Sequence, residues 1–385
     1  MLGATRNITL PTTITGSLPR PFWYTESLQG RPFSQMLNQV AFRDQYFDAL
    51  TCFINDQTRA GLDIVTDGDC RFDRDVGGRS WIAYPLEHMD GLTGASGPTK
   101  FKSIGEAAPG TLMREIQGAP QWPYVTSALG RGHMEYARMW KGAQALTRKP
   151  VKFGAISAQI LLWYVNNQFY KDDDETLAAL CDVMNQEWRD IADAGCPIIQ
   201  IEDPLVHFAA LDPAAKPKEI QGWVDAFNRE VRGVKSEVWY HACWGNPAQQ
   251  RVHDEIQSYE RGLEWMVQCD ADVITLETAA SGGMDLHHLK HLKTDKKFAI
   301  GVIDHRNCQV ETPQQVASLL RKALEYIPPE RLVVTSDCGF GREGLPRRVA
   351  FYKVVSLVKG TNIVRKELGL PEADVLVADP KLQLF

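Results

Sequence analysis

The sequence is poor in cysteine, and its cysteines are not spaced as a disulfide or zinc-ribbon framework. There are eight among 385 residues, and none of them forms a Cys-x-x-Cys pair. Disulfide-stabilised scaffolds carry a much higher density of cysteine. We therefore expect a protein of a reducing compartment whose thiols are free or bound to metal.

Long apolar runs and an excess of positive charge are missing as well. The longest apolar run covers residues 160–165, far short of the ~20 residues that a membrane-spanning helix needs. The first residues hold no apolar segment of signal-peptide length. Lys and Arg number 42 against 48 Asp and Glu, for a net charge of −6, so no basic stripe is available to neutralise phosphates. These absences predict a cytoplasmic protein with no membrane or nucleic-acid partner.

What the sequence does contain is a repeated order of short apolar run, small or polar residues, and helical pattern. Eight such runs begin near residues 12, 63, 151, 197, 237, 272, 297 and 331. Continuous apolar runs of this kind are typical of parallel strands buried on both faces. With no linker or internal repeat, they predict an α/β fold: a single (β/α)8 TIM-barrel domain over 1–385. An insertion is expected near residues 75–135, since that stretch exceeds a normal crossover.

Two of the connecting helices have clear termini. Thr312, Pro313 and Gln315 form a capping-box pattern that opens a helix predicted over 312–327. A second helix is predicted over 174–194, with Gly195 as its C′ residue immediately before the next strand.

Chemically active side chains gather where the last three predicted strands end. His241 and Cys243 close the sixth strand, Glu277 the seventh and Cys338 the eighth. Residues two apart on a strand project to the same side, and neighbouring strand ends meet at the carboxyl edge of a barrel. Thiolate, imidazole and carboxylate donors suit Zn²⁺. The alternative is a buried histidine beside cysteines that serve as small apolar core residues.

These motifs resemble those of cobalamin-independent methionine synthase. The family's zinc-binding His-x-Cys matches VWYHACWGN, its zinc glutamate matches DADVITLE, and its last zinc cysteine matches TSDCG. TTITGSLPRP is similar to the family's IGS-P segment, and IIQIEDP to its IQIDEP. The resemblance covers residues 9–370 and implies zinc as cofactor, held by His241, Cys243, Glu277 and Cys338.

The resemblance also implies roles for residues around the metal. Glu277 is the ligand that gives way to a substrate sulfur, which zinc keeps as a nucleophilic thiolate. Asp69 takes the place of a carboxylate that binds the substrate amine, although its acidic, arginine-flanked loop also suits a solvated surface. The other substrate-binding and catalytic candidates are Gly16, Ser17 and Trp163, and the acidic pair Glu202 and Asp203. For Trp163 the alternative is a core position, and for the acidic pair it is structural pairing with arginine.

The departures from the family concern the methyl donor. The family's DIHS histidine, which assists proton transfer to the folate leaving group, is replaced by Arg306, with His305 one residue earlier. The acidic pair reads Glu-Asp in place of Asp-Glu. No counterpart of the N-terminal barrel of long methionine synthases is expected.

The expected activity is zinc-dependent transfer of a methyl or other alkyl group to a small thiol. Homocysteine is the first choice of acceptor, together with a methyl donor. The alternatives are thiol alkylation of the epoxyalkane:coenzyme M transferase type, in which Arg306 or His305 steadies an alkoxide, and a structural zinc barrel without turnover. A homo-oligomer is possible.

Overall fold

The computed structural model describes residues 3–24, 31–71, 80–97, 122–244, 258–341 and 345–377. Much of the predicted insertion, and most of the acidic loop after Asp69, lie outside these residues. The predicted metal, catalytic and substrate-binding side chains all lie within them.

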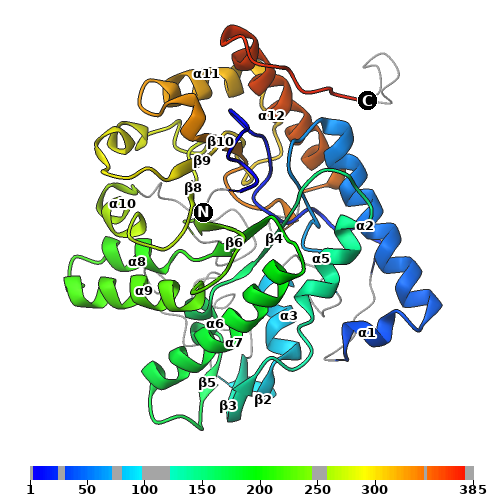
Figure 1. Ribbon diagram of the computed structural model, residues 1–385, viewed down its shortest axis with the longest axis vertical. Helices are drawn as coiled ribbons and strands as arrows, with labels where there is room; N and C mark the ends of the chain where they lie inside the picture. Colours follow the sequence, from blue (N-terminus) through cyan, green and yellow to red (C-terminus); the bar gives the residue numbers. More distant parts are fainter. Residues whose placement is uncertain are drawn as a thin grey trace, which may run out of the picture.

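Within the described residues, seven strands form one parallel sheet, hydrogen-bonded in the order β1-β4-β6-β7-β8-β9-β10. Figure 1 shows this curled sheet at the centre, with helices around it. Each strand falls in one of the predicted apolar runs, so the α/β class is confirmed. The strands are Val65–Thr66, Val151–Ile156, Ile198–Glu202, Glu237–Ala242, Val273–Leu276, Lys297–Gly301 and Leu332–Thr335.

The helices connect the strands, and the two predicted ones are present. Asp172 caps α7 (Asp173–Asp193), and Gly195 follows it at φ +104°, the left-handed conformation that favours glycine. Thr312 and Gln315 form the capping box of α11 (Pro313–Leu324), which ends three residues before the predicted 327. The others are α1 (Phe33–Met36), α2 (Val40–Ala60), α5 (Tyr136–Gln144), α6 (Ala158–Trp163), α8 (Leu205–Leu211), α9 (Pro217–Glu230), α10 (Glu260–Met266), α12 (Arg347–Glu367) and the 3₁₀ turns η1 (Leu286–His291) and η2 (Pro329–Arg331).

The first predicted strand, residues 12–17, is mostly not a regular strand. Thr12 forms a single parallel bridge with Val334, and its carbonyl accepts hydrogen bonds from the backbone of Asp63 and Ile64 on the opposite edge of the sheet. Further along, side chains take part in place of a regular backbone ladder. Thr15 N donates a hydrogen bond to Ser336 Oγ at 3.0 Å, and Thr15 Oγ1 donates one to the carbonyl of Ser336 at 2.7 Å. The segment therefore contacts both edges of the sheet while forming almost no ladder of its own.

The described part of the predicted insertion forms a separate layer. It comprises α3 (Ser80–His88) and the antiparallel strands β2 (Asp90–Gly97) and β3 (Trp122–Gly130). The short strand β5 (Asn166–Asn167) pairs with β3 to complete a three-stranded sheet. An excursion in this region agrees with the sequence-based expectation.

The N-terminal residues close the end of the sheet where the strands begin. Glu237, the first residue of β7, accepts hydrogen bonds from the backbone of Gly3 and Thr5 at 3.0 Å and from Thr5 Oγ1 at 2.7 Å. Above this, six buried side chains pack together, one from or beside each of six strands: Ile64, Ile198, Trp239, Val273, Ala299 and Val333. The strand starts are thus filled, and the polar chemistry lies at the opposite end.

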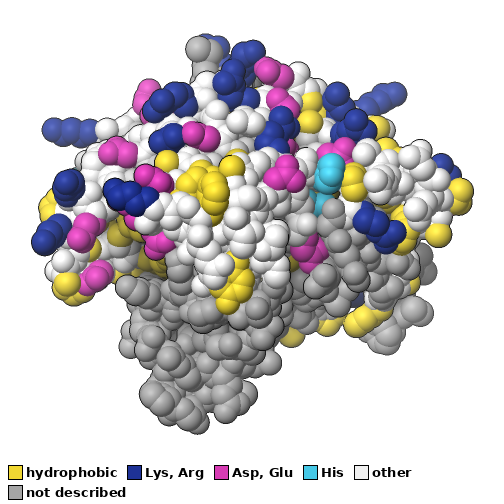
Figure 2. Space-filling model, turned by 90° about the horizontal axis from the view of Figure 1, so that it is seen from below, with side chains coloured by type: hydrophobic (Ala, Val, Ile, Leu, Met, Phe, Trp, Pro, Cys, Tyr) yellow, Lys and Arg dark blue, Asp and Glu magenta, His cyan; other side chains and the backbone are white. Residues whose placement is uncertain are grey.

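The surface agrees with the charge balance of the sequence. On the face in Figure 2, basic and acidic side chains are interspersed over the described residues. None of the described helices is long and apolar enough to span a bilayer.

Asp63 joins the N-terminal segment to the sheet, and its loss should destabilise the fold. Asp63 Oδ2 accepts hydrogen bonds from Thr12 N and Oγ1, both at 2.8 Å, and is ion-paired with Arg365, which is 5% exposed. Asp63→Ala should lower the free energy of unfolding by about 2–4 kcal/mol, because it leaves a buried guanidinium without its partner. Urea unfolding measures this. As a control, Asp193→Ala removes an exposed pair with Lys235 and should cost less than about 0.5 kcal/mol; equal losses would contradict the assignment.

Candidate metal centre

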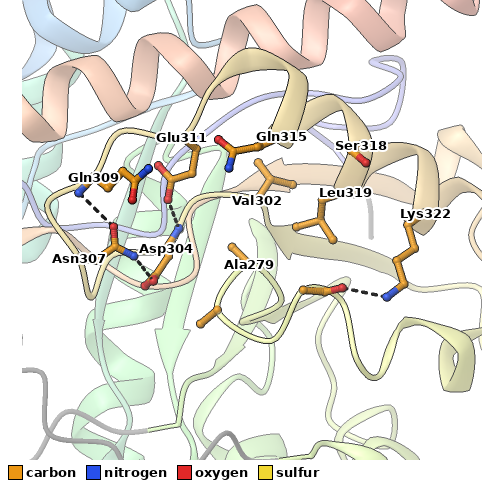
Figure 3. Close-up of a pocket in the computed structure, with 12 residues that line it drawn as sticks. Ala279, Val302, Asp304, Asn307, Gln309, Glu311, Gln315, Ser318, Leu319 and Lys322 are labelled. Atoms are coloured by element: carbon orange, nitrogen blue, oxygen red, sulfur yellow. Dashed lines mark hydrogen bonds between the residues drawn. The ribbon is translucent and has the colours of Figure 1, made fainter.

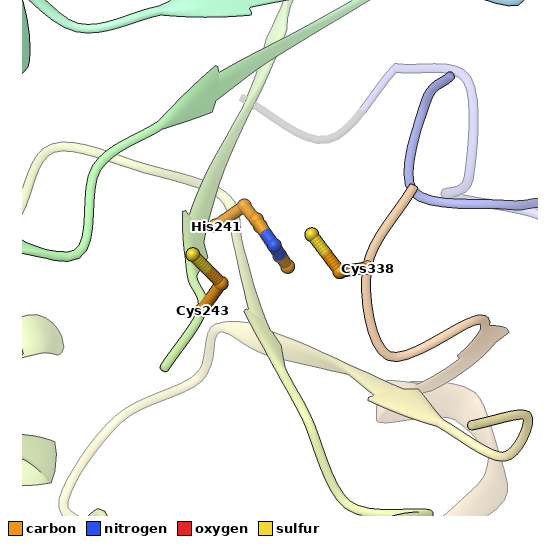
Figure 4. A group of neighbouring side chains, drawn as sticks. All are labelled: His241, Cys243 and Cys338. Carbon is orange, nitrogen blue, oxygen red and sulfur yellow. The ribbon is translucent and has the colours of Figure 1, made fainter. Parts of the chain in front are cut away.

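Three potential metal ligands converge at the carboxyl end of the sheet. His241 lies on β7 and Cys243 just after it, while Cys338 follows β10. One ligand atom from each lies within 4.8 Å of the other two, and all three residues are buried. Figure 4 shows the imidazole between the two sulfur atoms. The alternation of a strand places His241 and Cys243 on one side, and the curl of the sheet brings Cys338 to them.

This donor set fits zinc. Neither ring nitrogen of His241 has a hydrogen-bond partner of good geometry among the described residues, which is costly for a buried imidazole unless a metal binds it. Two sulfurs and one nitrogen are ligands that Zn²⁺ accepts in tetrahedral sites.

The acidic pair at the end of β6 points in two directions. Glu202 Oε2 lies 3.3 Å from His241 Nε2, and its other oxygen accepts a hydrogen bond from Gln200 Nε2 at 2.6 Å. Burial lowers the pKa of His241, but Glu202, Cys243 and Glu277 together raise it by more, so the pKa lies above its ordinary value. A carboxylate in this place orients a metal-binding histidine.

Asp203 points away from His241, toward Gln159 Nε2 at 2.8 Å and the backbone N of Leu205 at 3.0 Å. Burial raises its pKa to about 7. The Asp203 carboxylate therefore supports the start of α8 and the position of Gln159, while the backbone N of Asp203 donates to the carbonyl of His241 at 2.9 Å.

Glu277 lies beside the three converging residues but is held by another partner. Its carboxylate shares a cluster with Cys338 and His305, not with His241 and Cys243. Arg306 Nη1 pairs with Glu277 Oε2, and Arg306 Nη2 donates to Oε1 at 3.2 Å. The backbone N of Trp244 also donates to Oε1, at 3.1 Å. This pairing has no signal in the sequence, because it depends on the path of the loop after β9.

Arg306 supplies charge at this place but no proton. Burial disfavours its charged form, but Glu277 together with Asp337 and Cys338 raises the pKa of Arg306 above its already high value. Arg306 therefore cannot take over the proton transfer of the histidine it replaces in the family pattern. His305, fully buried and clustered with Glu277 and Cys338, is the titratable neighbour that remains.

Asp69 and Gly16 face each other next to β1. Asp69 is partly exposed and has a left-handed backbone with φ +53°. A Cβ added to Gly16 would lie 3.5 Å from Asp69 Oδ2, so the glycine leaves one side of the carboxylate uncovered. Burial raises the pKa of Asp69 to about 7, against the opposing charge of Arg71. A partly exposed carboxylate of this kind can pair with a cationic ligand group.

Ser17 and Trp163 lie in different surroundings. Ser17 Oγ accepts a hydrogen bond from Gly341 N at 3.1 Å, and its carbonyl accepts from Phe340 N at 2.9 Å, so Ser17 fixes the loop after Cys338. A Cβ on Gly339 would lie 2.2 Å from Ser17 Oγ, which explains the glycine in TSDCG. Trp163 ends α6 and stacks on Phe208 with ring centroids 6.4 Å apart.

Asp337 is a residue of this region that the sequence reasoning did not single out. Its carboxylate accepts hydrogen bonds from the backbone N of Thr278, Ala279 and Ala280 at 2.8 to 2.9 Å. Burial raises its pKa to about 8. Asp337 thereby ties the loop after Glu277 to the residue before Cys338. In the sequence, only its position immediately before Cys338 could have indicated that Asp337 belongs to this region.

A cavity of about 490 Å³ adjoins these loops but contains none of the three converging ligands. Figure 3 shows it between the loop after β8, the loop after β9 and α11. Asp304 and Glu311 form one wall, and Lys322 at the far side donates to the carbonyl of Gly282 at 2.8 Å.

Comparison with known proteins decides the family. The sequence-family model that describes the catalytic domain of cobalamin-independent synthase matches residues 10–359 of this chain. The chain belongs to this family. The resemblance seen in the strand-end motifs is thus confirmed.

Relatives of this family member include methionine synthases of similar length. The protein from Saccharolobus solfataricus is 28% identical over 93% of this chain and 96% of its own. The methionine synthase from Thermococcus kodakarensis is 30% identical over 94% of this chain and 95% of its own. The B12-independent methionine synthase from Shewanella sp. W3-18-1, solved with selenomethionine, has a TM-score of 0.74 at 24% identity, covering 94% of this chain and 99% of that one. These methionine synthase relatives indicate that the present chain is a methyltransferase.

Cys338→Ser tests the candidate metal centre. A serine hydroxyl is a poor zinc ligand, so the variant should retain less than about 0.1 zinc per chain where the parent protein retains about one. Metal analysis after purification without chelator measures this. Cys52→Ser, on α2 and outside the described ligand clusters, is the matched control and should keep its zinc. Undiminished zinc in Cys338→Ser would remove this residue from the ligand set.

Proposed function

We propose that this protein is a zinc-dependent methyltransferase that methylates a small thiol, with homocysteine as acceptor. The observation that supports this most is the buried cluster of His241, Cys243 and Cys338 with Glu277 beside it. Zinc bound there would keep a substrate sulfur as thiolate at neutral pH. Three protein ligands and one exchangeable position are the arrangement that catalytic zinc requires.

We also infer that the curled sheet closes as an eight-stranded barrel through the segment around Thr12. The support is that Pro11 and Thr13, on either side of Thr12, bond to Val334 on one edge, while the carbonyl of Thr12 accepts from Asp63 and Ile64 on the other. In a barrel the working residues lie at the carboxyl ends of the strands, where the four proposed ligands lie. We propose that the chain works as one domain over residues 1–385.

The surrounding side chains would each serve the thiol reaction. Glu202 orients His241, and Ser17 fixes the loop that carries Cys338. Asp203 acts indirectly by holding Gln159, while Trp163 and Gly16 shape the space for substrate. His305 is the candidate for moving a proton near the reacting groups.

Asp69 is the reason for choosing homocysteine over coenzyme M as acceptor. Homocysteine carries an ammonium group that a carboxylate attracts, whereas coenzyme M carries a sulfonate that a carboxylate repels. Thiol alkylation of the coenzyme M type is the second candidate, favoured by the cationic Arg306 beside the ligands. A structural zinc site without turnover is the alternative from another class. The methyl donor, a cytoplasmic location and a possible homo-oligomer remain predictions.

X-ray absorption at the zinc edge separates an enzyme from a structural site. On adding homocysteine, the zinc should gain a third sulfur neighbour and lose an oxygen neighbour, because the substrate takes the exchangeable position. Coenzyme M at the same concentration is the comparison thiol and should bind more weakly. A metal shell unchanged by either thiol would favour the structural site.

The pH dependence of homocysteine binding tests Asp69. With a pKa of about 7, this carboxyl is mostly ionised at pH 8 and mostly protonated at pH 6. The affinity for homocysteine should therefore fall about tenfold from pH 8 to pH 6, relative to 4-mercaptobutanoate, which lacks only the amine. Titration calorimetry with both thiols measures the ratio and cancels the ionisation of the sulfur. Asp69→Asn should abolish both the preference and its pH dependence; a preference that survives this change would exclude Asp69 as amine partner.

A further inference from the structure

The carboxylate of Glu277 is held in place by three hydrogen bonds. Arg306 contacts both of its oxygens, and the backbone N of Trp244 donates to Oε1. An ionised carboxylate offers about four acceptor positions, so most of those on Glu277 are taken by these donors.

Arg306 is itself rigidly placed. Its side chain is 12% exposed, its guanidinium lies 5.3 Å from the ring centroid of Trp244, and its backbone N donates to Asp304 Oδ1 at 2.7 Å. The buried Lys353 anchors the same loop through the carbonyl of Asp304 and the carboxylate of Glu311. The ion pair is therefore a built feature of the loop after β9.

The position of Glu277 is next to the metal donors without being among the three that converge. It clusters with Cys338, a ligand shared with the main group, while one of its hydrogen-bond donors belongs to Trp244, which follows Cys243. The carboxylate thus lies close enough to Cys338 to share a metal with it, but the hydrogen bonds described here hold it on Arg306.

The charges explain why such a resting place matters. Two cysteinates balance a divalent metal, and the charge of Glu277 is then balanced by Arg306. If a substrate thiol bound to a metal held here, losing its proton to solvent, the carboxylate of Glu277 that it displaced would remain within a buried site. A displaced carboxylate without a partner there would be strongly destabilised.

We propose that Arg306 is a positioning residue that receives Glu277 when the substrate thiolate takes its place on the metal. The inference rests on the proposed function. Arginine suits this task because its planar guanidinium binds both carboxylate oxygens and stays charged at every physiological pH. Arg306 makes the exchange of one anionic ligand for another possible without protonation of Glu277.

Metal and thiol binding without turnover test this. In Arg306→Gln, Glu277 loses its resting place and should ligate the metal more firmly. Zinc affinity, measured by chelator competition, should rise about tenfold, and homocysteine affinity, measured from the visible spectrum of the Co²⁺-loaded protein, should fall about tenfold. Arg306→Lys, which keeps the charge but not the two-point contact, should give intermediate values and guards against a variant that fails to fold.

The decisive variant removes both partners. Adding Glu277→Gln to Arg306→Gln should restore homocysteine affinity to that of Glu277→Gln alone, because the competing carboxylate is gone. A merely structural role for Arg306 predicts no such rescue. Arg321→Gln breaks an exposed arginine–glutamate pair of similar two-point geometry with Glu367 and serves as the matched control.

The outcomes separate this inference from the function on which it rests. If the parent protein binds zinc and homocysteine but Arg306→Gln behaves like Arg321→Gln, or loses both affinities without rescue, Arg306 has no part in ligand exchange. If the parent protein binds neither zinc nor homocysteine, the proposed function fails, and this inference with it.

Discussion

A concentration of carboxyl groups at the carboxyl end of the sheet is the constraint on which the rest of the site depends. Glu202, Asp203, Glu277 and Asp337 all lie there, and burial raises the pKa of each. A folded protein tolerates such groups only where a charge, a hydrogen-bond donor or a metal compensates them. Each carboxylate here has a different compensation: an imidazole, a side-chain amide, a guanidinium and three backbone amides. These compensations fix the loops, and the loops in turn fix the proposed ligands.

The convergence of His241, Cys243 and Cys338 could be predicted from the sequence because it follows from general geometry. Residues two apart on a strand share a side, and parallel strands end at one edge. The family motifs added Glu277 to the set. The sequence could not predict where that carboxylate rests, because this depends on a loop that brings Arg306 back toward β8.

In the fold, too, some features could be predicted from the sequence and others could not. Buried apolar runs marked the seven strands of the sheet, since a strand covered on both faces has few polar positions. The segment after Thr12 has the same β-branched composition but is not a regular strand. Thr15 and Ser336 bond through side chains as well as backbone, and composition does not distinguish such a junction from a ladder. The pairing of β5 with β3 was also beyond prediction, because β5 has only two residues and follows α6 without an apolar run of its own.

The contacts of the N-terminal segment have a consequence for the order of assembly. Thr5 bonds Glu237, Thr12 forms a bridge with Val334, and Ser17 fixes the loop after Cys338, so residues early in this sequence find their partners late in it. Thr15 and Ser336 are 321 residues apart. During synthesis on the ribosome, this edge of the sheet must wait until nearly the whole chain has emerged. The cysteine that completes the proposed metal centre follows two residues after Ser336, so this centre cannot be complete before this edge of the sheet can close.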